Sequence, residues 1–239
     1  MNAVVDFCGV KVDNVDQAEA IAKVRQFLAS SQPHLIFTPN PEMIVAAQED
    51  HELRNILNDA SLRVPDGISM IVVSKLLGDP LKERVSGIDL MLKITELSGK
   101  EGYKLFLLGS APGVAQKAAQ ILSQRYSVKI VGTNDGYFGD DLGVINKIKA
   151  SGADIIFVGL GAGRQERWLN RHLNELGLKV GMTIGGSLDV ISGNKKRAPR
   201  WIQALYIEWL YRLFTEPNRW KRQLALPQFL WLMFFKRPK

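Results

Sequence analysis

The sequence that decides the fold is YKLFLLGSAPG, residues 103–113. Residues 103–108 are mostly apolar, which is typical of a strand buried on both faces of a sheet. Glycine and proline then end the strand, and the next segment carries Val114, Ala118, Ile121 and Leu122 at helical spacing. A buried strand, a tight turn and an amphipathic helix together predict one unit of a parallel sheet.

The same alternation of strand and helix recurs along the first 190 residues. Helices are expected around residues 18–28, 68–77, 114–122 and 165–176, the last ending at Gly177. Strands are expected around Val10 and at 34–38, 62–65, 103–108, 128–131, 154–159 and 179–184. The pattern predicts an α/β fold with a Rossmann-like, mostly parallel sheet that carries helices on both faces.

Composition limits the class of protein. The chain has 239 residues, 46% of them apolar and 23% charged, which suits one packed core and argues against global disorder. A single cysteine, Cys8, excludes a disulfide framework and a cysteine-based zinc site. The first residues do not resemble a secretory signal, and no apolar run reaches the roughly 20 residues that span a bilayer. We therefore expect a cytoplasmic protein.

Charge and tryptophan are concentrated at the end of the chain. Residues 1–194 carry 20 basic and 22 acidic side chains, whereas residues 195–239 carry 11 basic and 2 acidic ones. Four of the five tryptophans also lie after residue 194. This break predicts a Rossmann-like core at 1–194 and a basic, amphipathic helical appendage at 195–239.

The predicted strands end in loops rich in glycine and polar residues, and ligands bind at this edge of a parallel sheet. These loops are TPNPE (38–42), PDG (65–67), LGSAPG (108–113), NDGYFG (134–139), GLGAGRQE (159–166) and GGSLD (185–189). The glycine loops either cradle a phosphate at a helix N-terminus or serve only as tight turns, with Glu166 complementing the helix dipole. We expect substrate to contact Gly109, Ser110, Gly113, Tyr137, Gly161, Gly163, Gly185 and Asp189.

Asp66 is the carboxylate best placed for chemistry, because it follows a strand at the ligand edge. It either caps the next helix or accepts a proton from a hydroxyl nucleophile. Thr38 and Asn40 are equally consistent with a proline-rich turn, and Arg84 with a solvated surface charge. The three histidines have no spacing that indicates a metal site or a catalytic triad.

The appendage has the composition of a peripheral membrane anchor. A helix is expected to begin at Pro199 and to carry the apolar stripe Ile202, Leu205, Trp209, Leu210 and Leu213. A second helix places Arg219 and Arg222 on one face, and Pro227 is expected to end it.

The last helix, 228–235, would rise only about 12 Å, which suits the headgroup region of a membrane. Alternatively, the aromatic residues pack on the body or on another subunit. The last segment has too few charges for a nucleic-acid groove.

Several of these motifs occur together, in one order, in a known family. They are Thr38-x-Asn40-x-Glu42, Pro65-Asp66-Gly67, Arg84-Val85-x-Gly87, Gly161-x-Gly163-x-Gln165-Glu166, Arg197-Ala198-Pro199, Glu208-Trp209-x2-Arg212 and Glu216-Pro217-x-Arg219-x2-Arg222. With them the chain resembles the TagA/WecG/CpsF family, glycosyltransferase family 26, over almost its whole length, and its TagA-like members above all. It departs from the family at Gly163-Arg164, where Pro-Lys is common.

The resemblance implies a membrane-associated, inverting glycosyltransferase that needs no metal or other cofactor. Its donor would be UDP-N-acetylmannosamine, and its acceptor N-acetylglucosamine on undecaprenyl diphosphate, in an early step of wall teichoic acid synthesis. Asp66 would be the general base. Thr38, Asn40 and Gln165 would line the same pocket, and Arg84 would lie near the donor phosphates or the acceptor. Arg212, Arg219 and Arg222 would close over the site and hold diphosphate.

The residues themselves support part of this implication. A transfer of this kind needs an activated hydroxyl and a stabilised leaving group, which a carboxylate and arginines can supply. No Asp-x-Asp pair suited to Mg²⁺ follows a predicted strand. An oxidoreductase is disfavoured, because no acidic residue ends the strand near 129–131.

Three alternatives remain open at this stage. The donor could be a different UDP-sugar in another surface polysaccharide pathway, or the chain could be a nucleotide-binding membrane adaptor without catalysis. The apolar tail helices also permit self-association of the chain. Nucleic acid is not an expected partner.

Overall fold

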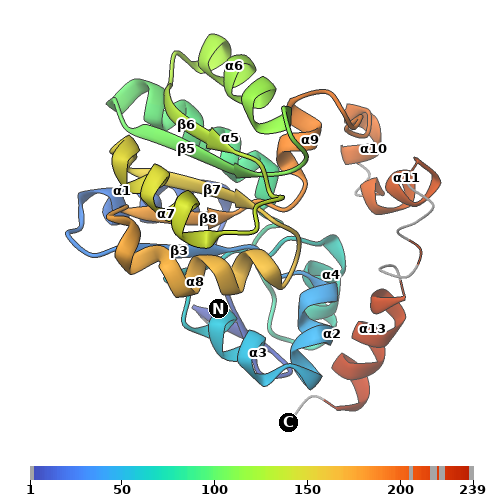
Figure 1. The fold of residues 1–239 in the computed structure, drawn as a ribbon. Helices are drawn as coiled ribbons and strands as arrows, with labels where there is room; N and C mark the ends of the chain where they lie inside the picture. Colours follow the sequence, from blue (N-terminus) through green and yellow to red (C-terminus); the bar gives the residue numbers. More distant parts are fainter. Residues whose placement is uncertain (1–2, 205–206, 216–219, 221–223, 237–239) are drawn as a thin grey trace.

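The computed structural model of the chain describes residues 3–204, 207–215, 220 and 224–236. Its centre is a sheet of six parallel strands in the order β4-β3-β8-β7-β5-β6 (Figure 1). These strands are β3 (His34–Phe37), β4 (Leu62–Arg63), β5 (Lys104–Gly109), β6 (Lys129–Asn134), β7 (Ile155–Gly159) and β8 (Val180–Thr183). The predicted α/β class and the parallel sheet are therefore confirmed.

Alternate residues of the central strands enter two separate cores. Leu105 and Leu107 of β5 face one core, whereas Phe106 and Leu108 face the other. The first core is closed by α1 (Gln17–Ala29), α5 (Gly87–Glu101), α6 (Val114–Tyr126) and α9 (Ser187–Ile191). The second is closed mainly by α2 (Pro41–Glu49), α3 (His51–Asn58), α4 (Ile68–Leu76), α7 (Asp141–Ser151) and α8 (Arg164–Leu176). Burial on both faces explains why these strands are apolar throughout.

Local capping residues set several helix ends. Asp16 and Glu19 form a capping box at the start of α1, and Asn40 caps α2 ahead of Pro41. Gly177, in the left-handed conformation, ends α8 as the sequence predicted. Helices α2, α3, α5, α7 and α9 were not predicted from the sequence.

An antiparallel hairpin precedes the sheet, and only its second strand was predicted. It consists of β1 (Val4–Phe7) and β2 (Val10–Asp13), joined by Cys8 and Gly9, both with positive φ. That backbone conformation matches the twist of a two-residue hairpin turn. The Arg63 Nε atom lies 3.0 Å from the Asp13 carboxylate and ties the hairpin to β4.

The structure corrects two predictions about the C-terminal segment. The helix expected from Pro199 through Leu213 is divided into α10 (Arg200–Ala204) and α11 (Glu208–Thr215). Pro227 does not end a helix. It lies in the first turn of α13 (Ala225–Phe235), where a missing N–H group needs no intrahelical partner.

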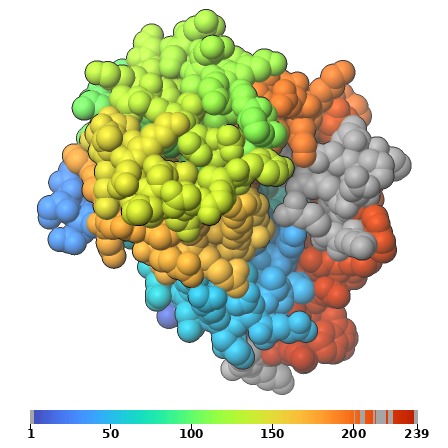
Figure 2. Space-filling model, in the orientation of Figure 1, coloured from blue at the N-terminus to red at the C-terminus, as the bar shows by residue number. Residues whose placement is uncertain are grey.

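Helix α13 has one buried face and one exposed face. Phe229, Leu232 and Met233 join the second core, and the Phe229 ring stacks on Phe7 with centroids 6.1 Å apart. The alternative that tail aromatics pack on the body therefore holds for this face, and Figure 2 shows the red helix against the blue segment that contains α2. Leu230, Trp231, Phe234 and Phe235 remain exposed. None of the described helices combines the length and apolar character needed to cross a bilayer.

We predict that Phe229→Ala lowers the free energy of unfolding by about 3–5 kcal/mol, because it empties a fully buried site against Phe7. Urea denaturation measures the loss. Phe235→Ala is the matched control, since this side chain is 77% exposed and its loss should change stability by less than about 0.5 kcal/mol. Equal effects of the two variants would show that α13 does not pack as described.

Candidate active site

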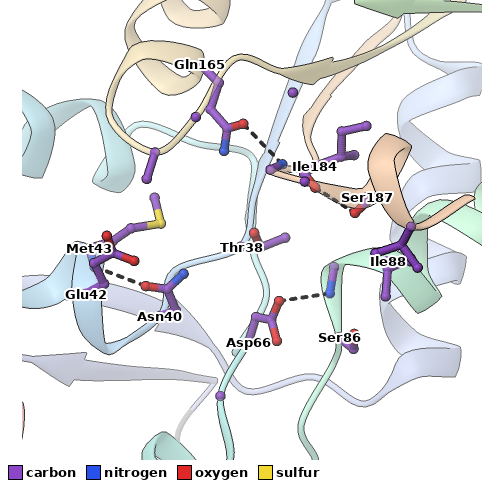
Figure 3. Close-up of a pocket in the computed structure, with 18 of the residues that line it drawn as sticks. Thr38, Asn40, Glu42, Met43, Asp66, Ser86, Ile88, Gln165, Ile184 and Ser187 are labelled. Carbon is purple, nitrogen blue, oxygen red and sulfur yellow. Dashed lines mark hydrogen bonds between the residues drawn. The ribbon is translucent and has the colours of Figure 1, made fainter. Parts of the chain in front are cut away.

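A cavity of about 740 Å³ opens at the carboxyl edge of the sheet. Residues from all six loops named in the sequence analysis line it, together with residues of the C-terminal segment. Figure 3 shows Thr38, Asn40, Asp66 and Gln165 around this cavity. Residues that are far apart in the sequence meet here because parallel strands all end at the same edge.

Backbone segments pack closely together at this edge of the sheet. A Cβ atom at Gly109 would lie 2.2 Å from the carbonyl oxygen of Gly159, and one at Gly159 would lie 2.6 Å from the carbonyl oxygen of Gly185. The ends of β5 and β7 and the loop after β8 therefore approach more closely than any side chain permits.

The predicted glycine contacts divide into two groups. Gly161 and Gly185 line the cavity. Gly109, Gly113 and Gly163 are not among the lining residues, and their contact with substrate stays a prediction. Gly109 allows the close approach to Gly159, while Gly113 and Gly163 take positive φ at the N-caps of α6 and α8.

Asp66 does not cap the helix that follows it. The N-cap residue of α4 is Gly67, and no side chain makes a capping hydrogen bond to the first turn of this helix. The backbone N–H of Gly87 instead donates to Asp66 Oδ2 at 3.1 Å (Figure 3). The carboxylate thus lies at the N-terminus of α5, which attracts negative charge, and it also borders the cavity.

Arg84 is not the solvated surface charge that its local pattern suggested. Its side chain is 18% exposed, and its Nη2 atom lies 3.6 Å from Asp66 Oδ1. The same Nη2 atom lies 3.6 Å from Glu208 Oε2 of α11. Glu208 was not predicted to belong to the site, because nothing local distinguishes it from a surface glutamate at the start of a helix.

Gln165 is fixed at both ends of its amide group. Its Nε2 donates to Glu166 Oε1 at 2.7 Å, and its Oε1 accepts the backbone N–H of Gly185 at 3.1 Å. Glu166 is fully buried and also accepts the N–H of Gly163 at 2.6 Å. Burial raises the pKa of Glu166 above its usual value, although the hydrogen bonds from Gln165 and Gly163 oppose the shift. Glu166 therefore caps α8 and orients Gln165 at the cavity wall.

Thr38 and Asn40 both border the cavity from the loop after β3. Asn40 Oδ1 accepts the backbone N–H of Met43 at 3.1 Å and thereby caps α2, as the turn alternative suggested. This bond uses the amide oxygen and fixes the side chain at the cavity rim (Figure 3).

Three other loops also line the cavity. Ser110 Oγ donates to Asp189 Oδ2 at 3.1 Å, so two of the predicted contacts are joined directly. Tyr137 is 78% exposed at the rim. Arg164 Nη1 donates to the carbonyl oxygen of Gly136 at 3.1 Å, and its guanidinium lies over the Phe138 ring. An aromatic ring at the rim and paired polar groups below it are suited to a nucleotide.

The start of the C-terminal segment adds two cations that the sequence analysis missed as site residues. Lys195 and Lys196 line the cavity beside α9. Their position directly after a loop at the ligand edge is the local feature that would have identified them. Among the described residues, no three histidine, cysteine, aspartate or glutamate side chains lie together as a metal-binding group.

The appendage borders the cavity, but its predicted arginines are only partly placed. Glu208 and Trp209 of α11 and Ala225 and Leu226 of α13 line the cavity. Arg212 belongs to α11, but its side chain lies outside the description. Arg219 and Arg222 lie outside the described residues altogether.

We predict that Gly87→Ala impairs the site without weakening the fold. A Cβ atom at Gly87 would lie 3.3 Å from both Asp66 Oδ2 and Thr38 Cγ2, which displaces the carboxylate. Alanine is also the better helix former, so stability should not fall. The sugar transfer that the resemblance implies should drop about tenfold or more. Unchanged transfer, or a lower melting temperature, would contradict this prediction.

Comparison with known proteins shows the family of the chain. The family model "Glycosyl transferase WecG/TagA/CpsF family" matches residues 5–239. An N-acetylglucosaminyldiphosphoundecaprenol N-acetyl-beta-D-mannosaminyltransferase of Staphylococcus aureus (strain MRSA252) is 35% identical over 96% of this chain and 91% of its own length. Proteins of the same name from Bacillus subtilis (strain 168) and Bacillus spizizenii are also 35% identical, over 82% and 85% of this chain and 77% and 80% of their own lengths. The chain therefore belongs to the WecG/TagA/CpsF family of glycosyltransferases.

Proposed function

We propose that this protein transfers N-acetylmannosamine from UDP-N-acetylmannosamine to N-acetylglucosamine on undecaprenyl diphosphate, with inversion and without a metal ion. The observation that carries the proposal is the pairing of Asp66 with Arg84 in a cavity at the ligand edge of the sheet. The names of the similar mannosaminyltransferases support this choice of sugar and acceptor. The product would be a disaccharide lipid that begins wall teichoic acid.

Asp66 acts as the general base in this mechanism. Its carboxylate takes the proton from the acceptor hydroxyl, whose oxygen forms a bond to the anomeric carbon of the donor. The bond between that carbon and the UDP oxygen lies on the opposite face of the sugar. It breaks as the new bond forms, and UDP leaves with the electron pair of the broken bond. The hydrogen bond from Gly87 N–H fixes Asp66 Oδ2 and so defines the direction in which the carboxylate approaches the acceptor.

Cationic side chains stabilise the negative charge that develops on UDP. Arg84 provides a guanidinium beside Asp66, and Lys195 and Lys196 provide ammonium groups along the same cavity. Forked and ammonium donors match phosphate oxygens and can take the place of a divalent cation. Arg212, Arg219 and Arg222 are proposed to add to this charge when the appendage closes over bound substrate.

The residues that line the cavity divide into two groups by the substrate that we assign to them. We assign the nucleotide-sugar to Ser110, Tyr137, Gly161, Gly185 and Asp189, which include an exposed ring and a pair of polar side chains. Thr38, Asn40 and Gln165 border the same cavity as Asp66 and are assigned to the reacting sugars. An adaptor without catalysis would not need a carboxylate and an arginine paired beside so many polar groups.

The appendage, residues 195–239, is proposed to dock on the inner face of the cell membrane. The exposed face of α13 carries Leu230, Trp231, Phe234 and Phe235, followed by Lys236. Aromatic rings and a basic terminus suit the headgroup region of an anionic bilayer. Docking there would bring the cavity to a lipid-linked acceptor and complete the active site.

A transfer assay with Asp66→Asn tests the function. Wild-type protein is given a panel of UDP-sugars and a short-chain prenyl-diphosphate acceptor, and UDP-N-acetylmannosamine should be the preferred donor. Asp66→Asn should lower kcat by about 10²–10⁴-fold, because an amide cannot take the proton. Calorimetry should show that UDP affinity stays within about twofold of wild type, because UDP binding does not involve the general base.

The matched control is Asp59→Asn, which makes the same change on an exposed residue outside the cavity and should leave both measurements unchanged. Preference for another UDP-sugar would correct the donor but keep the reaction class. No transfer from any donor, or an Asp66→Asn variant as active as wild type, would contradict the proposal.

We predict that replacing both Trp231 and Phe235 by serine lowers binding to anionic vesicles at least about tenfold, since both side chains are exposed on α13. Co-sedimentation with phosphatidylglycerol vesicles measures the binding. Leu142→Ser is the control, because Leu142 is equally accessible on α7, away from α13 (Figure 1). Similar losses in both proteins would contradict docking through α13.

A further inference from the structure

Glu208 is a buried carboxylate to which the proposed mechanism gives no role. It is one of only two acidic residues in a segment of 45 residues that holds 11 basic ones. It is the first residue of α11 and is 6% exposed. A glutamate in the first turn of a helix interacts favourably with the dipole while it is solvated. Burying its charge is costly unless the charge is paired, so its inward position needs a reason.

Arg84 explains the inward position of Glu208, because its guanidinium lies between the carboxylates of Asp66 and Glu208. Arg84 Nη2 is 3.6 Å from Asp66 Oδ1 and 3.6 Å from Glu208 Oε2. Both separations exceed the length of a good hydrogen bond, so Arg84 has closed on neither partner. Its Nε atom is buried and has no hydrogen-bond partner among the described residues. The guanidinium thus keeps donor capacity for an oxygen beyond those that the described residues supply.

A second arginine helps to hold the charge of Glu208 in place. Arg197 Nη2 donates to Asp89 Oδ2 at 2.7 Å. Burial opposes the charge on Arg197, but this bond and the nearby charges of Glu208 and Asp66 raise its pKa above the usual value. Glu208 therefore lies in the field of two arginines, which accounts for a buried carboxylate in a basic segment.

We infer that Glu208 is a positioning residue that acts through Arg84. Its charge balances that of Asp66 and keeps the guanidinium from closing on the base. Without this balance, Arg84 would move to a direct charge-assisted hydrogen bond with Asp66, at about 2.7–2.9 Å. That bond would occupy the oxygen that must accept the proton and would turn Arg84 away from substrate. The inference rests on the proposed function, in which Asp66 is the base.

The variant Glu208→Gln tests this inference, because it removes the charge and keeps the shape. We expect kcat to fall about tenfold or more, while UDP affinity and the melting temperature stay near wild type. Glu208→Asp should recover part of the loss. In an Arg84→Lys background, Glu208→Gln should cost nothing further, since the residue through which it acts has already been changed. Glu96→Gln, the same substitution at a half-exposed residue of α5 outside the cavity, is the control and should leave kcat unaltered.

A crystal structure of Glu208→Gln provides a readout that does not depend on activity. It should show Arg84 within hydrogen-bond distance of Asp66, and an unchanged separation would overturn the inference. A kcat equal to that of wild type would also overturn it. A higher kcat would overturn it as well, because Glu208 would then hinder the transfer reaction. Loss of folding or of UDP binding would assign Glu208 a structural role instead. If the wild-type protein transfers no sugar, the proposed function fails, and the variant's structure still decides the position of Arg84.

Discussion

The cavity depends on one constraint, the backbone contact between the ends of three parallel segments. An added Cβ atom at Gly109 or Gly159 would meet a carbonyl oxygen at 2.2 or 2.6 Å. With no side chains at these positions, the three segments pack backbone against backbone, and the side chains that line the cavity come from the surrounding loops and the C-terminal segment. The sheet therefore sets the place of the site, and the loops set its chemistry.

A chain of alternating charges connects Asp66 to the C-terminal segment. Arg84 Nη2 lies 3.6 Å from both Asp66 Oδ1 and Glu208 Oε2. Because partly buried charges interact more strongly than solvated ones, a change at Glu208 should be felt at Asp66. The candidate base is thus electrostatically coupled to the first turn of α11, the helix that also carries Arg212.

Helix α13 reconciles two interpretations that the sequence presented as alternatives. One face completes the second core through Phe229, and the other leaves Trp231 and Phe235 exposed. A helix that belongs to the core cannot move far without uncovering Phe7. We therefore expect α13 to act as a fixed platform for docking. The division of the chain at residue 194 stays a prediction, because α13 shares the core of the body.

The sequence by itself determined the α/β class, most of the strands and the loops that surround the cavity. These features depend on apolar runs, helical spacing and turn residues, all of which act between near neighbours. Only the tertiary structure decided what the charged side chains do. Asp66 accepts a bond from Gly87 rather than capping α4, Arg84 is partly buried, and Glu208 points inward. Each of these outcomes depends on groups that are 18 to 124 positions apart in the sequence, and no local pattern encodes a contact that exists only after the chain has folded.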